Sequence, residues 1–151
     1  MIGGPTDRCP PFRFSAQARV DVSDTDLFRI VYYGRFLPYF DGALIAYRRH
    51  IGVDLIGPDG HRYVVRHVDV DYRQSARFDD LLEVFVRVAH VGRTSHTVAY
   101  RVERLADGGS VHVADGRAAL VGLDADRRPT PVPDAVRDAI VAFEGDRVEL
   151  G

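Results

Sequence analysis

Asp24 and Asp26 stand on either side of one threonine, directly before a nearly uncharged segment that is rich in aromatic residues. Asp side chains bond to their own backbone in turns, so both acids could have a purely structural role. A carboxylate at the mouth of an apolar pocket could instead act as a nucleophile or take a proton from water. The spacing by itself leaves both interpretations open.

The segments on either side of the two acids predict a strand and a helix. Phe12–Val22 alternates apolar and polar residues, which is typical of a half-buried strand, and Ser23–Asp26 reads as a turn. After Tyr33 the apolar residues recur at helical spacing, at Phe36, Phe40, Ala43, Leu44, Tyr47 and Ile51. We therefore expect a helix of roughly four turns that begins near Gly34 or Arg35 and ends at Gly52.

Four further strands and a short helix are predicted downstream. The strands cover Arg62–Tyr72, Leu81–His90, Thr94–Leu105 and Val111–Leu123, a loop covers Ile56–His61, and the helix covers Pro133–Glu144. Short turns between long strands favour an antiparallel meander that curls around the long helix, an α+β fold. A ferredoxin-like sandwich would need a long helix among the later strands, and the sequence has none there.

Composition indicates one globular domain. The chain has 151 residues, 46% of them hydrophobic and 28% charged, with a net charge of -2 that does not favour nucleic acid as a partner. No apolar run approaches the ~20 residues of a membrane span, so no membrane insertion is expected. The single cysteine, Cys9, suits a reducing compartment and a cytoplasmic location. We expect residues 1–11 to be a flexible, Gly- and Pro-rich tail and residues 12–151 to be the domain.

An ordered set of motifs runs through most of the chain. Its parts are Asp24-Thr25-Asp26, Ile30-Val31-Tyr32-Tyr33, the spaced residues Tyr72, Ala76 and Asp80, and finally Arg93 and Ser95. From about Phe12 to Pro133 the sequence resembles the 4-hydroxybenzoyl-CoA thioesterase family of hotdog proteins, which includes acyl-CoA thioesterases associated with the Tol-Pal system. The resemblance implies a hotdog fold, with an antiparallel five-stranded sheet wrapped around a long central helix.

The same resemblance implies an acyl-CoA thioesterase that needs no cofactor or metal. The second acid of the turn is the catalytic carboxylate in the family, and this role falls on Asp26, while Asp24 is interpreted as structural. Backbone N–H groups around Tyr33 and Gly34, at the start of the helix, would stabilise the oxyanion. Arg93, Thr94 and Ser95 match positions near the phosphates or the pantetheine arm of coenzyme A in relatives.

Two other residues are candidate substrate contacts. Tyr32 could line an acyl pocket, whereas Tyr39 and Tyr47 are expected in the core. Arg29 stands where the family often has glycine, so it could narrow the site or contact an acidic group. His67, Asp69 and Asp71 share one face of a strand and are interpreted as an outer polar row rather than a metal site.

The resemblance also implies a homodimer or homotetramer, in which Asp26 of one chain faces the region around Asp71 to Arg73 of another. Two other functions stay open. The chain could release an acyl or polyketide group from an acyl carrier protein, or it could be a non-catalytic module that binds acyl thioesters. A hotdog dehydratase is disfavoured because no dehydratase-like His motif is present.

Overall fold

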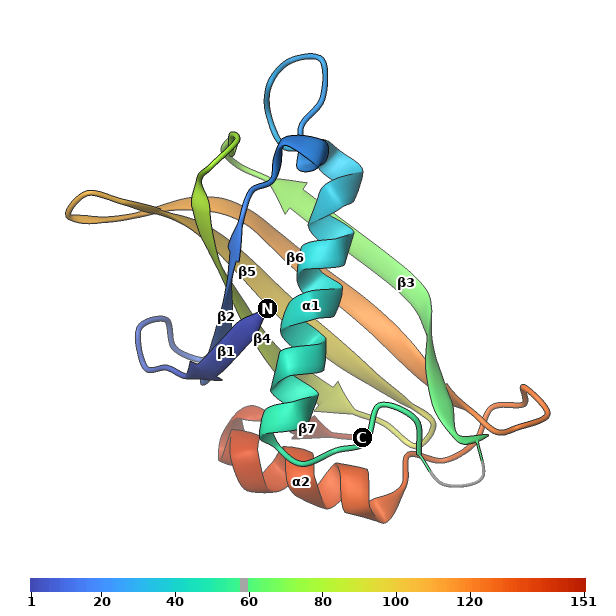
Figure 1. Ribbon diagram of the computed structural model, residues 1–151. Coiled ribbons are helices and arrows are strands. Elements are labelled where there is room, and N and C mark those ends of the chain that lie inside the picture. Colours follow the sequence, from blue (N-terminus) through green and yellow to red (C-terminus); the bar gives the residue numbers. More distant parts are fainter. Residues whose placement is uncertain (58–59) are drawn as a thin grey trace.

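The computed structural model describes residues 1–57 and 60–151 and shows a sheet that curves around one helix (Figure 1). The elements are β1 (Ile2–Pro5), β2 (Phe14–Arg19), α1 (Phe36–His50), β3 (Arg62–Tyr72), β4 (Leu81–Val91), β5 (Ser95–Ala106), β6 (Gly109–Leu123), α2 (Asp134–Glu144) and β7 (Glu149–Leu150). Short 3-10 turns cover η1 (Val22–Asp24), η2 (Tyr33–Arg35) and η4 (Gly145–Arg147). No helix in these ranges is long and apolar enough to cross a membrane.

The sheet confirms the α+β class but not the predicted number of strands. It has seven strands in the order β1-β2-β4-β5-β6-β3, with β7 pairing in parallel with β4. The prediction of five missed β1 and β7, whose four and two residues are too few to show periodicity. Strand β1 pairs with β2, so the segment expected to be a tail contains part of the sheet.

The predicted meander is correct for β4, β5 and β6 and wrong for β3. Strand β3 pairs antiparallel with β6, at the far edge of the sheet from β1. The connection from Arg73 to Asp80 is longer than a tight hairpin loop, and it carries the chain across to β4. The predicted loop at 56–61 lies partly outside the described residues, because residues 58 and 59 are not among them.

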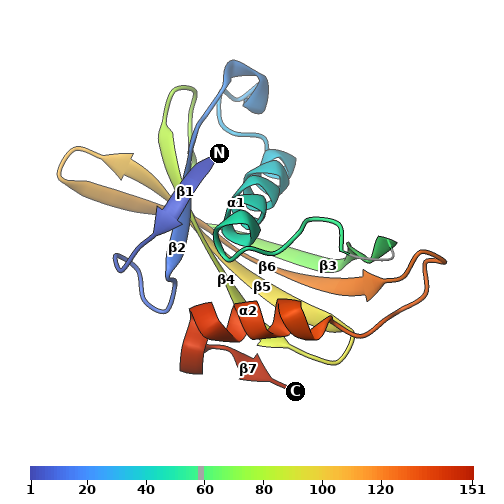
Figure 2. The ribbon, with the colours of Figure 1, turned by 60° about the horizontal axis from the view of Figure 1, so that its bottom comes forward.

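Helix α1 lies against the concave face of the sheet (Figure 2) and buries the apolar stripe that predicted it. The Phe40 ring stacks on Tyr100 of β5 with 4.4 Å between centroids. A Cβ atom at Gly116 of β6 would lie 2.5 Å from the Phe40 ring, so glycine permits this close approach. Tyr47 is fully buried and Tyr39 is 7% exposed, which confirms that both belong to the core.

The two ends of α1 meet different parts of the chain. At its C-terminal end, the ring of Phe143 on α2 meets Tyr47 edge-on with 5.6 Å between centroids. At its N-terminal end, Val31 donates its N–H to the carbonyl of Ala76, in the β3–β4 connection, at 2.8 Å. The first turns of α1, the Asp26 loop and the end of β3 therefore lie together at one end of the sheet (Figure 1).

Candidate active site

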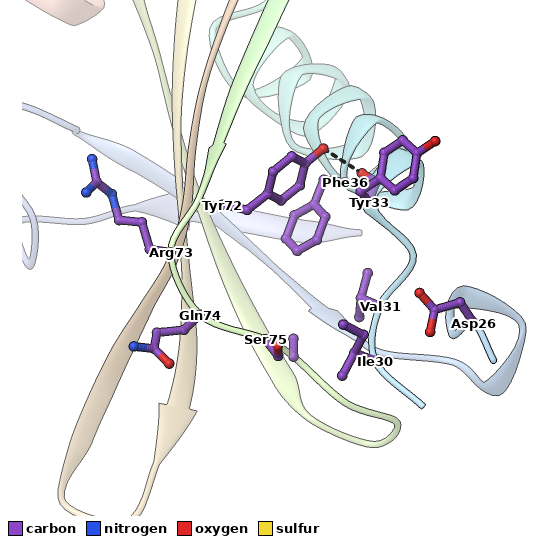
Figure 3. Close-up of a pocket in the computed structure, with 10 residues that line it drawn as sticks. Asp26, Ile30, Val31, Tyr33, Phe36, Tyr72, Arg73, Gln74 and Ser75 are labelled. Carbon is purple, nitrogen blue, oxygen red and sulfur yellow. Dashed lines mark hydrogen bonds between the residues drawn. The ribbon is translucent and has the colours of Figure 1, made fainter. Parts of the chain in front are cut away.

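A cavity of about 370 Å³ opens where the Asp26 loop, the start of the helix and the end of β3 meet (Figure 3). Its lining residues come from two stretches of the chain: Asp26, Ile30, Val31, Tyr33 and Phe36, and then Tyr72, Arg73, Gln74, Ser75 and Ala76. Most of the first group is apolar or aromatic, and Asp26 is its one acid. The cavity thus combines a carboxylate with a mainly apolar wall, as a site for an acyl group requires.

Asp26 is held in a tight turn that leaves part of its carboxylate available. Its Oδ1 accepts the N–H of Phe28 at 2.8 Å, and its own N–H donates to the carbonyl of Ile30 at 2.9 Å. Among the described residues, Oδ2 accepts no hydrogen bond. The backbone therefore fixes the side chain while one oxygen stays free for a ligand in the cavity.

Asp24 has a different environment, in agreement with its structural interpretation. It is 6% exposed and accepts hydrogen bonds from Arg35 at 2.8 Å, from Tyr39 Oη at 2.7 Å and from the Asp21 N–H at 2.9 Å. Burial would raise the pKa of Asp24, but these hydrogen bonds hold it below its ordinary value. Asp24 thereby ties the loop to η2 and α1 and positions Asp26 beside the helix start.

The helix begins with the 3-10 turn η2, whose first two residues are Tyr33 and Gly34. The N–H of the third residue, Arg35, already has a partner, because it donates to the Tyr32 carbonyl at 2.8 Å. In the described part of the chain, the N–H groups of Tyr33 and Gly34 have no such partner. Tyr33 lines the same cavity as Asp26, so the start of the helix borders that cavity.

The region around Asp71 to Arg73 was expected to face Asp26 of another chain, whereas Tyr72 and Arg73 line the Asp26 cavity of their own chain. Tyr72 was not named by itself as a site residue. Its hydroxyl donates to the Tyr33 carbonyl at 2.9 Å (Figure 3), and its ring meets Phe36 edge-on at 5.4 Å. These contacts join β3 to the start of the helix and fix the width of the cavity. Its place in the Tyr72, Ala76, Asp80 motif was the signal that could have identified it.

Tyr32 and Arg29 lie near the cavity without lining it. The Tyr32 ring packs on Tyr33 with 4.4 Å between centroids and stays 41% exposed. Arg29 is exposed and has a φ of 63°, a left-handed conformation that strains side chains other than glycine. The turn geometry gives a physical reason why glycine would suit this position.

Arg93, Thr94 and Ser95 are not brought to Asp26 within one chain. Arg93 and Thr94 lie between β4 and β5, and Ser95 is the first residue of β5. The Arg93 carbonyl accepts the Val132 N–H and the Thr94 carbonyl accepts the Gly122 N–H, both at 2.8 Å. Strand β4 begins near the Asp26 end of the sheet, and its 11 residues span roughly 35 Å before this turn. Within one chain, these three residues therefore lie at the other end of β4 from Asp26.

His67, Asp69 and Asp71 lie in exposed positions on β3. The closest approach, His67 Nε2 to Asp69 Oδ2, is 3.3 Å, and Asp71 stands opposite Asp115 of β6. Within the described ranges, no group of three or more His, Cys, Asp or Glu side chains is arranged to hold a metal ion.

Known proteins resemble this chain in sequence and in fold. The family model of the thioesterase-like superfamily matches residues 20–140. The acyl-CoA thioesterase YbgC of Haemophilus influenzae is 35% identical over 81 residues, which cover 52% of this chain and 60% of that protein. The chain thus matches less than two thirds of the length of that curated relative.

Solved structures agree with this assignment. A thioesterase of Thermus thermophilus, crystallised with coenzyme A and Zn, is 33% identical, with a TM-score of 0.71 over 87% of this chain and 93% of that one. A thioesterase superfamily protein of Jannaschia sp. CCS1 has a TM-score of 0.83 at 23% identity, over 93% of this chain and 88% of that one. Because the Jannaschia protein is only 23% identical to this chain, its similarity shows a shared fold alone.

Proposed function

This chain belongs to the thioesterase-like superfamily, and we propose that it hydrolyses an acyl-CoA thioester to a free acid and coenzyme A. The observation that carries the proposal is that Asp26 and Tyr33, the first residue of the turn that starts the helix, line one cavity. Coenzyme A bound to the similar Thermus thermophilus thioesterase supports the choice of thiol.

The proposed reaction uses Asp26 against the thioester carbonyl carbon. As a general base, Asp26 takes a proton from water while the hydroxide adds to the carbonyl carbon. As a nucleophile, its free oxygen adds directly and gives an anhydride that water then hydrolyses. In both routes the Tyr33 and Gly34 N–H groups donate to the oxyanion, the C–S bond breaks, and the thiolate leaves with a proton.

We propose that the other predicted substrate contacts come from two chains of an oligomer. Tyr32 and Arg29 would meet the substrate at the cavity mouth, and Arg93, Thr94 and Ser95 would contact coenzyme A from a second chain. We assign the chain to the hotdog fold, and we expect it to form a homodimer or homotetramer. A cytoplasmic location is supported by the single cysteine.

Substitution of the proposed catalytic acid is the central test. We expect Asp26→Asn to keep the fold and to lower kcat by about 10²-fold or more, the scale of losing a positioned acid–base group. A panel of acyl-CoA substrates, followed by thiol release, gives the measurement, and circular dichroism checks the fold. Asp138→Asn, on the exposed side of α2, is the matched control and should leave kcat unchanged.

Near-normal turnover in a folded Asp26→Asn protein would exclude the proposed role of Asp26. Single-turnover hydrolysis in ¹⁸O-water can identify the nucleophilic route, since the label enters the Asp26 carboxylate only when water attacks the Asp26 carbonyl carbon of the anhydride. If the purified protein binds acyl-CoA but releases no thiol, it is a binding module instead. Activity confined to thioesters carried on an acyl carrier protein would assign the other substrate class.

A further inference from the structure

A second cavity, of about 190 Å³, lies between α1 and the part of the sheet formed by β3 and β6. Most of its lining is apolar: Leu37, Phe40, Leu44, Val65, Val68, Ala118 and Leu120. A dry cavity of about 150 Å³ in another protein binds benzene, so this one can hold part of an organic molecule. The residues assigned so far to the reaction do not line it.

Tyr100 of β5 brings a hydroxyl group into this apolar lining. Its side chain is 3% exposed, and the hydroxyl makes no hydrogen bond among the described residues. The unpartnered polar atoms that are sealed inside that part of the chain do not include it, so the hydroxyl opens onto the cavity. Burial, and then the charge of Asp41, raise the pKa of Tyr100, so its phenol stays protonated and can donate to a ligand.

Asp41 of α1 is the other polar residue in the lining. It follows Leu37 by four residues and precedes Leu44 by three, so the three side chains share one face of the helix. The ion pairs found among the described residues do not include Asp41. Asp41 is exposed at the mouth of the cavity, but partial burial against the apolar walls raises its pKa. The cavity therefore offers one donor and one acceptor that need a partner.

The second cavity lies next to the Asp26 cavity along α1 and β3. Tyr72 lines the first cavity and Val68 the second, on the same face of β3, and four residues of strand span about 13 Å. Phe36 and Asp41 line the two cavities from α1, and five residues of helix span about 8 Å. Tyr72 and Val68 are 50% and 36% exposed, so a chain can pass between the cavities along the open edge of the sheet.

We propose that the second cavity holds the far end of the acyl group and favours a chain with a terminal hydroxyl, which donates to Asp41 and accepts from Tyr100. This proposal rests on the acyl-CoA hydrolysis proposed above, with the thioester carbonyl at Asp26. At no more than about 1.5 Å per bond, the span requires at least about six to nine bonds between carbonyl carbon and hydroxyl. The substrate class is therefore a medium-chain ω-hydroxyacyl thioester. A plain chain would leave the Tyr100 hydroxyl unpaired, and a terminal carboxylate would be repelled by Asp41.

The kcat/KM values for 10-hydroxydecanoyl-CoA and decanoyl-CoA, measured by thiol release, test this preference. We expect the wild type to favour the hydroxylated substrate by about tenfold, the scale of a hydrogen bond to a charged group. Tyr100→Phe and Asp41→Leu should each bring the ratio close to one, mainly by lowering kcat/KM for the hydroxylated substrate. Tyr63→Phe removes a hydroxyl outside the cavity, and Asp138→Leu removes an exposed acid of α2, so both controls should keep the wild-type ratio.

A wild-type ratio near one, or a ratio that neither cavity variant changes, overturns the proposal and leaves two groups that bind only water. A higher kcat/KM for 10-aminodecanoyl-CoA than for the hydroxylated substrate would assign an ammonium group to Asp41 and would also overturn it. If a variant does not fold, the wild-type ratio decides.

The failure of the proposed hydrolysis gives a different result, because neither thioester would then release thiol. Calorimetric titration of the wild type with the same two intact thioesters decides in that case. Binding of 10-hydroxydecanoyl-CoA about tenfold tighter than decanoyl-CoA supports the hydroxyl site, and equal binding overturns it.

Discussion

Asp24 and Asp26 show how two identical side chains, two residues apart, acquire different properties. Asp24 is surrounded by donors from Arg35, Tyr39 and the Asp21 amide, which use both of its oxygens. Asp26 accepts only from Phe28 among the described residues and faces the cavity. Asp24 is thus committed to holding the loop, and Asp26 is the acid that remains available for chemistry.

Arg29 combines a strained backbone with a place beside the proposed catalytic acid. We expect Arg29→Gly to raise the free energy of unfolding by about 0.5–1 kcal/mol, because glycine adopts a positive φ without strain. If Arg29 contacts an acidic substrate group, the same change should also raise KM. Chemical denaturation and steady-state kinetics measure the two effects.

Arg127→Gly is the matched control, since Arg127 has a φ of 61° in a turn far along the chain. It should give a similar gain in stability with no change in KM. A KM that rises equally in both variants, or in neither, would rule out a specific substrate contact at Arg29.

At the scale of elements, Glu144 joins α2, α1 and β4 at one buried point. Its Oε1 accepts the Tyr47 hydroxyl at 2.8 Å and the Val88 N–H at 3.1 Å, beside the irregularity in β4 between Val88 and His90. Oε2 is buried without a partner among the described residues. The last residue of α2 therefore completes the hydrogen bonding of a distorted strand.

The charge of Glu144 should make this junction sensitive to pH. Burial raises the pKa of Glu144, although the bonds from Tyr47 and Val88 and the charges of Arg87 and Arg13 oppose this. A raised pKa in the folded state means that stability is lost as the pH rises from the unfolded value, about 4.3, through the folded value. Glu144→Gln keeps both acceptor bonds without a charge, so it should remove this loss.

Urea unfolding at several pH values checks this prediction. Glu144→Gln should match the wild type at or below about pH 4 and exceed it by about 1 kcal/mol at pH 8, because it avoids an ionised buried group. Glu149→Gln, at an exposed position in β7, should follow the wild-type pH profile. A constant difference between Glu144→Gln and the wild type across this range would contradict the ionisation argument.

At the scale of the whole molecule, β3 is an edge strand with exposed apolar side chains. Among the described strands it pairs only with β6, and Val64 and Val65 are 41% and 54% exposed. Edge strands of this kind are usually paired or covered. We therefore expect β3 to pair with β3 of a second chain, so that the sheet continues through the oligomer.

Sedimentation equilibrium at micromolar concentration should show a dimer or a larger species. Val64→Lys should weaken association by about tenfold or more, because a lysine on an edge disfavours strand pairing. Ile2→Lys places the same charge on the opposite edge, at a residue that is 91% exposed, and should leave association unchanged. A monomer with full thioesterase activity would refute both the shared sheet and the shared site.

The distance of Arg93 from Asp26 makes its proposed role a property of the oligomer. If Arg93 contacts a coenzyme A phosphate bound at another chain, Arg93→Ala should raise KM for acyl-CoA by about tenfold with kcat nearly unchanged. A pantetheine thioester, which lacks the nucleotide, should be much less affected. Steady-state kinetics on both substrates gives the test, and equal effects on them would exclude a phosphate contact.

The sequence by itself determined the elements that have strong local periodicity. The predicted range of β3 is identical to the observed one, and those of β4, β5, β6 and α2 differ by one or two residues at an end. The apolar stripe of α1 was also evident, because one face of a helix must be buried. The two acids and the helix start are close in sequence, so their proximity was predictable too.

Only the tertiary structure decided which distant segments meet. Local alternation shows that β3 is a strand but carries no information about its partner, so its pairing with β6 could not be read from the pattern. For the same reason, neither β1 nor the junction at Glu144 could be predicted from local patterns. Nor could such patterns place Arg93 at the far end of β4, since the strand order and the register of a sheet are set by packing between segments far apart in the chain.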